Sequence, residues 1–257
     1  MARPVPGCHV DALFGHIVTM HGTRPWGRVL DAGTGRASLQ FVMGLQTESW
    51  TAVTGDDGEE RYLARELGAP ARPGDRVLTG HWRDATLLQG QVFDVVLADY
   101  LLGAVDRVDP YFQEQLLERL RQHVSGRLYL VGLEPLPDRA DGEGPAALRE
   151  LMRLADVTRL LAGERLYREF PLEWVQRSLV RAGFHVVNAT VFPIVYRTAA
   201  VDRQLAGCRD RLAHVDAPTR AALEARAVRL AATARDAARA GGIRMGSDYV
   251  VTAEPTA

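Results

Sequence analysis

The feature that most constrains the fold is a glycine turn between a short apolar run and a helical pattern, in the segment VLDAGTGRAS at residues 29–38. The apolar run ends at Asp31, and Gly33 and Gly35 follow before the helical spacing begins. Glycines in such a turn allow a nucleoside to approach the backbone more closely than a Cβ would permit. Strand, glycine turn and helix in this order favour a nucleotide-binding α/β fold.

Strand and helix patterns alternate along the rest of the chain. Strands are expected at 28–32, 50–55, 75–80, 93–102, 127–135, 185–196 and 247–255. Helices are expected at 10–20, 38–46, 58–68, 111–124, 146–162, 172–183 and 199–240, the last with a break near Ala217 and Pro218. Such alternation implies parallel strands with helices on both faces. We therefore predict an α/β fold with a doubly wound, mostly parallel seven-stranded sheet and helical insertions.

The pattern divides this fold into a core and two additions. Residues 1–134 hold an N-terminal helix and the cofactor-binding part of the core, and residues 172–198 and 246–257 complete the sheet. Residues 135–171 are predicted to be a helical insertion that could serve as a lid. Residues 199–245 are predicted to be a second insertion, a helical hairpin.

Composition excludes several classes of function. The net charge is −1, and all 31 basic residues are arginines, which excludes Schiff-base chemistry and a P-loop because both require lysine. Cys8 and Cys208 lie far apart without a metal-ligand spacing, so we predict no metal site. The chain lacks both an apolar run of about 20 residues and a secretory signal. We expect a cytoplasmic protein without membrane contact, and the arginine and alanine bias suggests a bacterial source.

The glycine turn distinguishes between cofactors. A nicotinamide-dinucleotide fingerprint needs a third Gly or Ala, and Ser38 occupies that place, so an NAD(P) oxidoreductase is disfavoured. The turn instead resembles the [D/E]-x-G-x-G-x-G pattern of the class I methyltransferases that use S-adenosylmethionine (SAM), with Ala37 replacing the last glycine. The resemblance implies a Rossmann-like fold and a SAM site that includes Asp31, Ala32, Gly33 and Gly35.

Two further segments carry the same resemblance. VTGDDGEE resembles the family's second-strand motif, which implies that Asp57, or its neighbour Asp56, binds the ribose hydroxyls; one of the two could instead cap the following helix. RDATLLQGQVFDVVLADY resembles the segment that implies an adenine contact for Asp84, with Arg83 in place of the usual Gly, and places Asp99 beside the donor methionine group. The resemblance covers residues 10–135, and more loosely 171–197 and the last strand.

Candidates for the acceptor side follow the strand ends. His81 and Tyr100 are the candidate catalytic residues, because each follows a strand at the edge where doubly wound sheets bind ligands. An ordinary loop histidine and a core tyrosine remain the alternatives. His16, Tyr111 and Phe112 are candidate substrate-binding residues, although packing roles explain them equally well.

These observations favour a SAM-dependent methyltransferase that acts on an oxygen or nitrogen atom of a small organic acceptor, in specialised metabolism. The family's [D/N/S]-P-P-[Y/F] tetrad is absent, because residues 99–102 read DYLL, which disfavours amide and nucleobase methylation. A SAM-binding regulatory subunit and an RNA or protein methyltransferase are the alternatives. The arginines of 220–244 are diluted by acids, which disfavours nucleic acid, and a homodimer is left open.

Overall fold

The computed structural model describes residues 9–67, 72–213 and 215–256. The chain divides into two compact units. The first, which we call the sheet unit, comprises Met1–Leu133, Glu169–Phe192 and Asp248–Ala257. The second, the helical unit, comprises Glu134–Arg168 and Pro193–Ser247.

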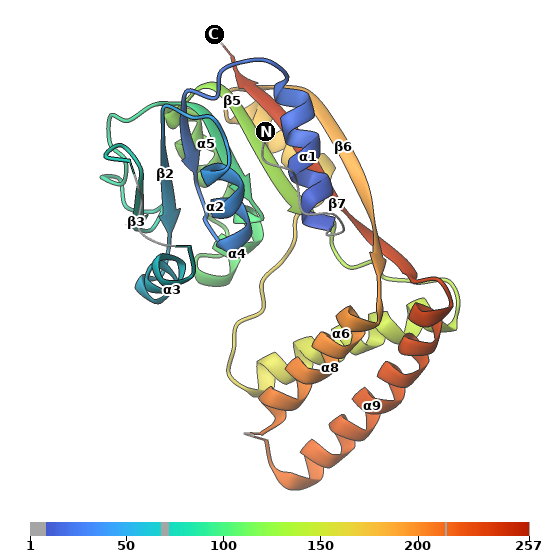
Figure 1. Ribbon diagram of the computed structural model, residues 1–257. Helices are drawn as coiled ribbons and strands as arrows, with labels where there is room; N and C mark the ends of the chain where they lie inside the picture. The colour runs from blue at the N-terminus through green and yellow to red at the C-terminus, as the bar shows by residue number, and fades with distance from the viewer. Residues whose placement is uncertain (1–8, 68–71, 214, 257) are drawn as a thin grey trace. The chain divides into compact units, whose positions relative to one another are not determined.

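A seven-stranded sheet in the order β3-β2-β1-β4-β5-β7-β6 organises the sheet unit (Figure 1). Its strands are β1 (Arg28–Asp31), β2 (Ser49–Thr54), β3 (Arg76–Thr79), β4 (Phe93–Asp99), β5 (Val124–Leu133), β6 (Phe184–Tyr196) and β7 (Ile243–Pro255). The pairs from β3 to β5 are parallel, whereas β7 runs antiparallel to β5. The predicted seven-stranded, mostly parallel α/β sheet is confirmed.

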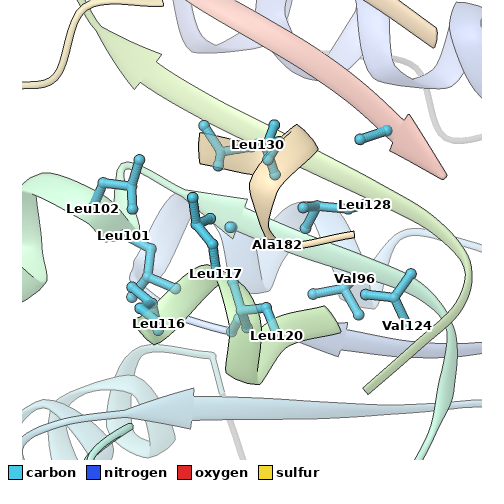
Figure 2. Packing of buried hydrophobic residues seen from close by; sticks show 14 of the residues in the cluster. Val96, Leu101, Leu102, Leu116, Leu117, Leu120, Val124, Leu128, Leu130 and Ala182 are labelled. Carbon is cyan, nitrogen blue, oxygen red and sulfur yellow. The ribbon is translucent and has the colours of Figure 1, made fainter. Parts of the chain in front are cut away.

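Helices pack on both faces of this sheet. The helices of one face are α1 (His9–His21), α2 (Arg36–Met43) and α3 (Asp57–Leu67). Those of the other are α4 (Leu101–Val108), α5 (Gln113–His123) and α7 (Leu172–Arg181). Successive residues of a strand serve opposite faces: Val95 and Leu97 of β4 pack with the first group, and Val96 with the second. Figure 2 shows leucines of α5 packed against Leu128 and Leu130 of β5.

The fourth strand is shorter than predicted. It ends at Asp99 rather than continuing to Leu102, because Tyr100 adopts a left-handed backbone (φ 48°) and α4 begins at the next residue. Leu101 and Leu102 are buried in the helix, as they would be in a strand. The run of apolar residues therefore gave no sign that the strand ends and a helix begins at this point.

The helical unit has a core of its own. Helices α6 (Glu143–Leu161), α8 (Thr198–Leu212) and α9 (Ala217–Ala240) bury Leu148, Leu205 and Ala231 against one another. The break between α8 and α9 is closed by Asp216, whose carboxylate accepts from the Thr219 amide at 3.1 Å. Both predicted insertions contribute to this one unit, while residues 169–171 belong to the sheet unit. Within the described ranges, no helix is long and apolar enough to cross a membrane.

The core contacts give a first prediction. Leu128 of β5 is fully buried in the core that includes the leucines of α5, so Leu128→Ala removes apolar contacts and leaves a cavity. We expect it to lower the free energy of unfolding by about 2–5 kcal/mol in urea denaturation. The exposed Val180 of α7 serves as control, and Val180→Ala should stay within about 0.5 kcal/mol of the wild type. Equal effects of the two substitutions would contradict this packing.

Candidate functional site

The turn between β1 and α2 is fixed by hydrogen bonds to both neighbouring strands. The Ala32 amide donates to the Leu97 carbonyl of β4, and the Thr34 amide donates to the Val53 carbonyl of β2, each at 2.8 Å. The buried indole of Trp82 donates to the Ala32 carbonyl at 2.7 Å. The backbone of the turn is therefore held in place from three sides.

The two glycines of the turn have different surroundings. A Cβ on Gly33 would lie 2.5 Å from Cδ1 of Leu101, so this glycine permits α4 to pack against the turn. A Cβ on Gly35 would meet no atom within 4 Å. The backbone of Gly35 is extended (φ −130°), which any residue can adopt, so neither contacts nor conformation within the chain require a glycine there. The space beside Gly35 is open, as a ligand would require.

Asp31, at the end of β1, is fully buried. Within the described part of the chain, no donor completes a hydrogen bond to either of its carboxylate oxygens. Burial raises the pKa of Asp31 to about 6, against the opposing influence of the Thr34 and Ser38 hydroxyls and the Gly33 amide. A buried carboxylate without a complete partner is costly, and a bound cation would compensate it.

Asp99 and Tyr100 follow at the end of the adjacent strand β4. Burial, and then the charges of Asp31 and Asp248, raise the pKa of Asp99 to about 7. Burial also raises the pKa of the Tyr100 phenol well above its usual value, and Asp248 adds to this by charge and by accepting its hydrogen bond. Asp31 and Asp99 are thus brought together, and Tyr100 is held as a neutral phenol beside them.

Two acids that sequence reasoning missed lie in the same unit. Asp248 belongs to β7, and Glu169 immediately precedes the segment that leads into α7. Burial raises the pKa of Glu169 to about 7, with further contributions from Asp248 and Asp106. No motif marked these residues, and residue 169 fell inside the predicted insertion. The available signal for Asp248 was its type, because an acid that interrupts an apolar strand is a candidate for a site, whereas Glu169 lies in a loop and carried no such signal.

The two aspartates after β2 have separate roles. Asp56 caps α3, because its Oδ1 accepts from the Gly58 amide at 2.5 Å. Asp57 is the first residue of α3 and is exposed. The capping role therefore falls to Asp56, and Asp57 is an exposed residue without that role.

The residues after β3 are spread over different surroundings. His81 is exposed, with its ring 3.7 Å from the Cβ position of Gly55, which follows β2. Arg83 forms an ion pair with Asp109 and lies over the Phe112 ring. Asp84 accepts from the Thr86 amide and hydroxyl through Oδ1 alone, at 2.8 and 2.7 Å. His81 thus lies near the end of β2, whereas Tyr100 follows β4.

The three candidate substrate-binding residues are not brought together. The His16 ring lies edge-on to Phe192 at 5.3 Å, and its Nε2 is buried without a hydrogen bond to any described residue. Phe112 is buried in the core beside α5, whereas Tyr111 is 78% exposed. The burial of Phe112 favours a packing role over a substrate-binding role for this residue. Among the described residues, no group of three His, Cys, Asp or Glu side chains could hold a metal ion.

The raised pKa of Asp99 predicts how stability depends on pH. Its pKa is about 7 in the folded state against 3.8 ordinarily, so the folded state holds this proton more strongly and loses stability as pH rises from about 4 to 7. Asp99→Asn mimics the protonated form and removes this loss. At pH 8 we expect the variant to exceed the wild type by on the order of 4 kcal/mol, at 1.4 kcal/mol per pKa unit.

The measurement is urea denaturation of both proteins at pH 5 and pH 8. The advantage of Asp99→Asn should grow between the two pH values. Asp236→Asn, at an exposed position of α9, should show no such growth. A constant difference between Asp99→Asn and the wild type would contradict the assignment.

Comparison with known proteins shows a likeness in structure alone. The chain matches no protein-family model and no curated protein. A SAM-dependent methyltransferase from Methanosarcina mazei is 13% identical, with a TM-score of 0.53 over 93% of this chain and 97% of its own. A mycolic acid cyclopropane synthase, in complex with S-adenosylhomocysteine (SAH), is 14% identical, with a TM-score of 0.56 over 95% of this chain and 83% of its own.

The same fold also occurs with a different reaction. The [4+2]-cyclase SpnF is 16% identical to this chain, with a TM-score of 0.56 over 96% of this chain and 81% of its own. At these identities the likeness concerns the fold and not the reaction. By its strand order and these matches, the chain has the Rossmann-like fold of the class I SAM-dependent methyltransferases.

Proposed function

We propose that this protein is a SAM-dependent methyltransferase that transfers a methyl group to an oxygen or nitrogen atom of a small organic acceptor. The observation that carries the proposal is the Asp31 carboxylate, fully buried beside the glycine turn with neither oxygen in a complete hydrogen bond to a described residue. SAM carries two positive charges, an ammonium and a sulfonium. A cationic ligand offsets the cost of burying carboxylates, which a neutral or anionic nucleotide would not do.

The other residues at this edge fit the same cofactor. The open space beside Gly35 accommodates a ligand close to the backbone, and the exposed carboxylate of Asp57 can accept from two ribose hydroxyls. Asp84 keeps its Oδ2 for an adenine amine, since Thr86 uses only Oδ1. When bound, SAM supplies a methyl group activated by the sulfonium.

The chain's own part in the reaction is to position the acceptor and to keep water away from it. Methyl transfer to a positioned nucleophile needs little more than a near-attack geometry, which contributes about 7–11 kcal/mol at best. Tyr100, a neutral phenol held by Asp248, is the candidate to orient the acceptor. His81 remains a candidate catalytic residue, although its position near Gly55 suits a contact with the nucleoside better.

Calorimetric titration with SAH tests the cofactor. We expect a dissociation constant on the order of micromolar for SAH and no saturable binding of NAD(P)H. Asp57→Asn should weaken SAH binding about tenfold, because it removes a charged acceptor of two hydroxyl bonds. Asp236→Asn, an exposed control in the helical unit, should bind as the wild type does. Binding of NAD(P)H, or of neither ligand, would refute the proposal.

The two glycines of the turn offer a matched pair. Gly35→Val places a side chain in open space, so we expect little change in melting temperature but at least about tenfold weaker SAH binding. Gly33→Val places a side chain against Leu101, so it should lower the melting temperature itself. Thermal denaturation and calorimetry of both variants separate the two effects. Unchanged SAH affinity in Gly35→Val would show that the space beside Gly35 is not the ligand site.

A further inference from the structure

The segment that carries Glu169 is fastened to β7. The Tyr249 hydroxyl of β7 donates to the Phe170 carbonyl at 2.6 Å. The Tyr249 ring has room because Gly132 on β5 lacks a side chain: a Cβ there would lie 2.3 Å from the ring's Cζ. A specific contact in the core therefore fixes the backbone next to Glu169.

A second glycine makes room for the Glu169 carboxylate itself. A Cβ on Gly103 would lie 2.7 Å from Oε2 and 3.3 Å from Oε1 of Glu169. Gly103 is the third residue of α4, where a glycine costs about 1 kcal/mol relative to alanine. The carboxylate thus lies over the first turn of the helix that begins directly after Asp99 and Tyr100.

The Glu169 carboxylate has no neutralising neighbour within the described part of the chain. It makes no hydrogen bond or ion pair there, and the groups that act on it by charge are Asp248 and Asp106. Its own charge in turn contributes to the raised pKa of Tyr100. A partly buried acid that faces other acids is unfavourable in the free protein, and a cationic ligand would relieve that repulsion.

We propose that Glu169 binds the methyl acceptor and that this acceptor is an amine; the proposal rests on the function proposed above. The amine enters as an ammonium ion and gives one proton to the Glu169 carboxylate. The nitrogen lone pair then forms the new N–C bond as the C–S bond of SAM breaks, with its electron pair remaining on sulfur. The products are the N-methylated ammonium ion and SAH, and Glu169 returns its proton to solvent.

The test compares amines with alcohols of the same shape. The full chain is saturated with SAH, and benzylamine and hexylamine are titrated at pH 8 against benzyl alcohol and hexanol, with thermal stabilisation and calorimetry as readouts. We expect the amines to bind more tightly than the alcohols. In Glu169→Gln this advantage should fall about tenfold, as expected for loss of a charge-assisted hydrogen bond.

Two further variants make the result specific. Glu173→Gln, at an exposed position of α7, should keep the amine advantage of the wild type. Gly103→Ala keeps the charge of Glu169 but displaces its carboxylate, so it should reduce the preference for amines over alcohols. Because alanine favours the helix more than glycine does, this variant should not destabilise α4 itself. Equal binding of amines and alcohols by the wild type, or an unchanged advantage in Glu169→Gln, would overturn the proposal. Absence of SAH binding would instead refute the cofactor assignment, so the two failures are distinguishable.

Discussion

The candidate site depends on the parallel pairing of β1 with strands on both sides. β1 lies between β2 and β4, and their hydrogen bonds continue past the strand end, where the Ala32 and Thr34 amides donate to β4 and β2. Because these hydrogen bonds fix the backbone of the turn, the turn cannot shift to fill the space around a buried polar side chain. The side chain of Asp31 is held there although no described residue completes a hydrogen bond to it, and its charge acts on Asp99 at the end of the adjacent strand.

The acids at this edge are costly for the stability of the fold, because each is at least partly buried. Burial raises the pKa values of Asp31, Asp99 and Glu169, and the charges of neighbouring acids raise those of Asp99 and Glu169 further. A chain selected only for stability would replace such groups with apolar ones. Ionisable groups are retained where a ligand of opposite charge offsets the cost, and SAM together with an amine acceptor would do so. The same logic accounts for Gly103, a helix glycine whose contact is Glu169.

The fold itself was predictable in most respects. Alternating strand and helix patterns predicted the seven-stranded sheet, because the period of apolar residues is a local property of each segment. The end of β4 was not predictable in this way, since Leu101 and Leu102 are buried in either conformation and the left-handed Tyr100 leaves no mark in composition. Similarly, the two predicted insertions, which residues 172–198 separate in the sequence, form a single helical core of α6, α8 and α9, and only long-range packing could decide this.

The sequence by itself determined the nucleotide-type turn, the acids that follow each strand, and the absence of lysine chemistry, because these are matters of residue identity and local spacing. Tertiary structure decided which of those acids act together. It assigned capping to Asp56, brought Asp31 and Asp99 together and placed His81 beside Gly55 at the end of β2. It also brought in Asp248 and Glu169 from distant segments. Electrostatic coupling depends on distance in space and on burial, and neither can be read from separation along the chain.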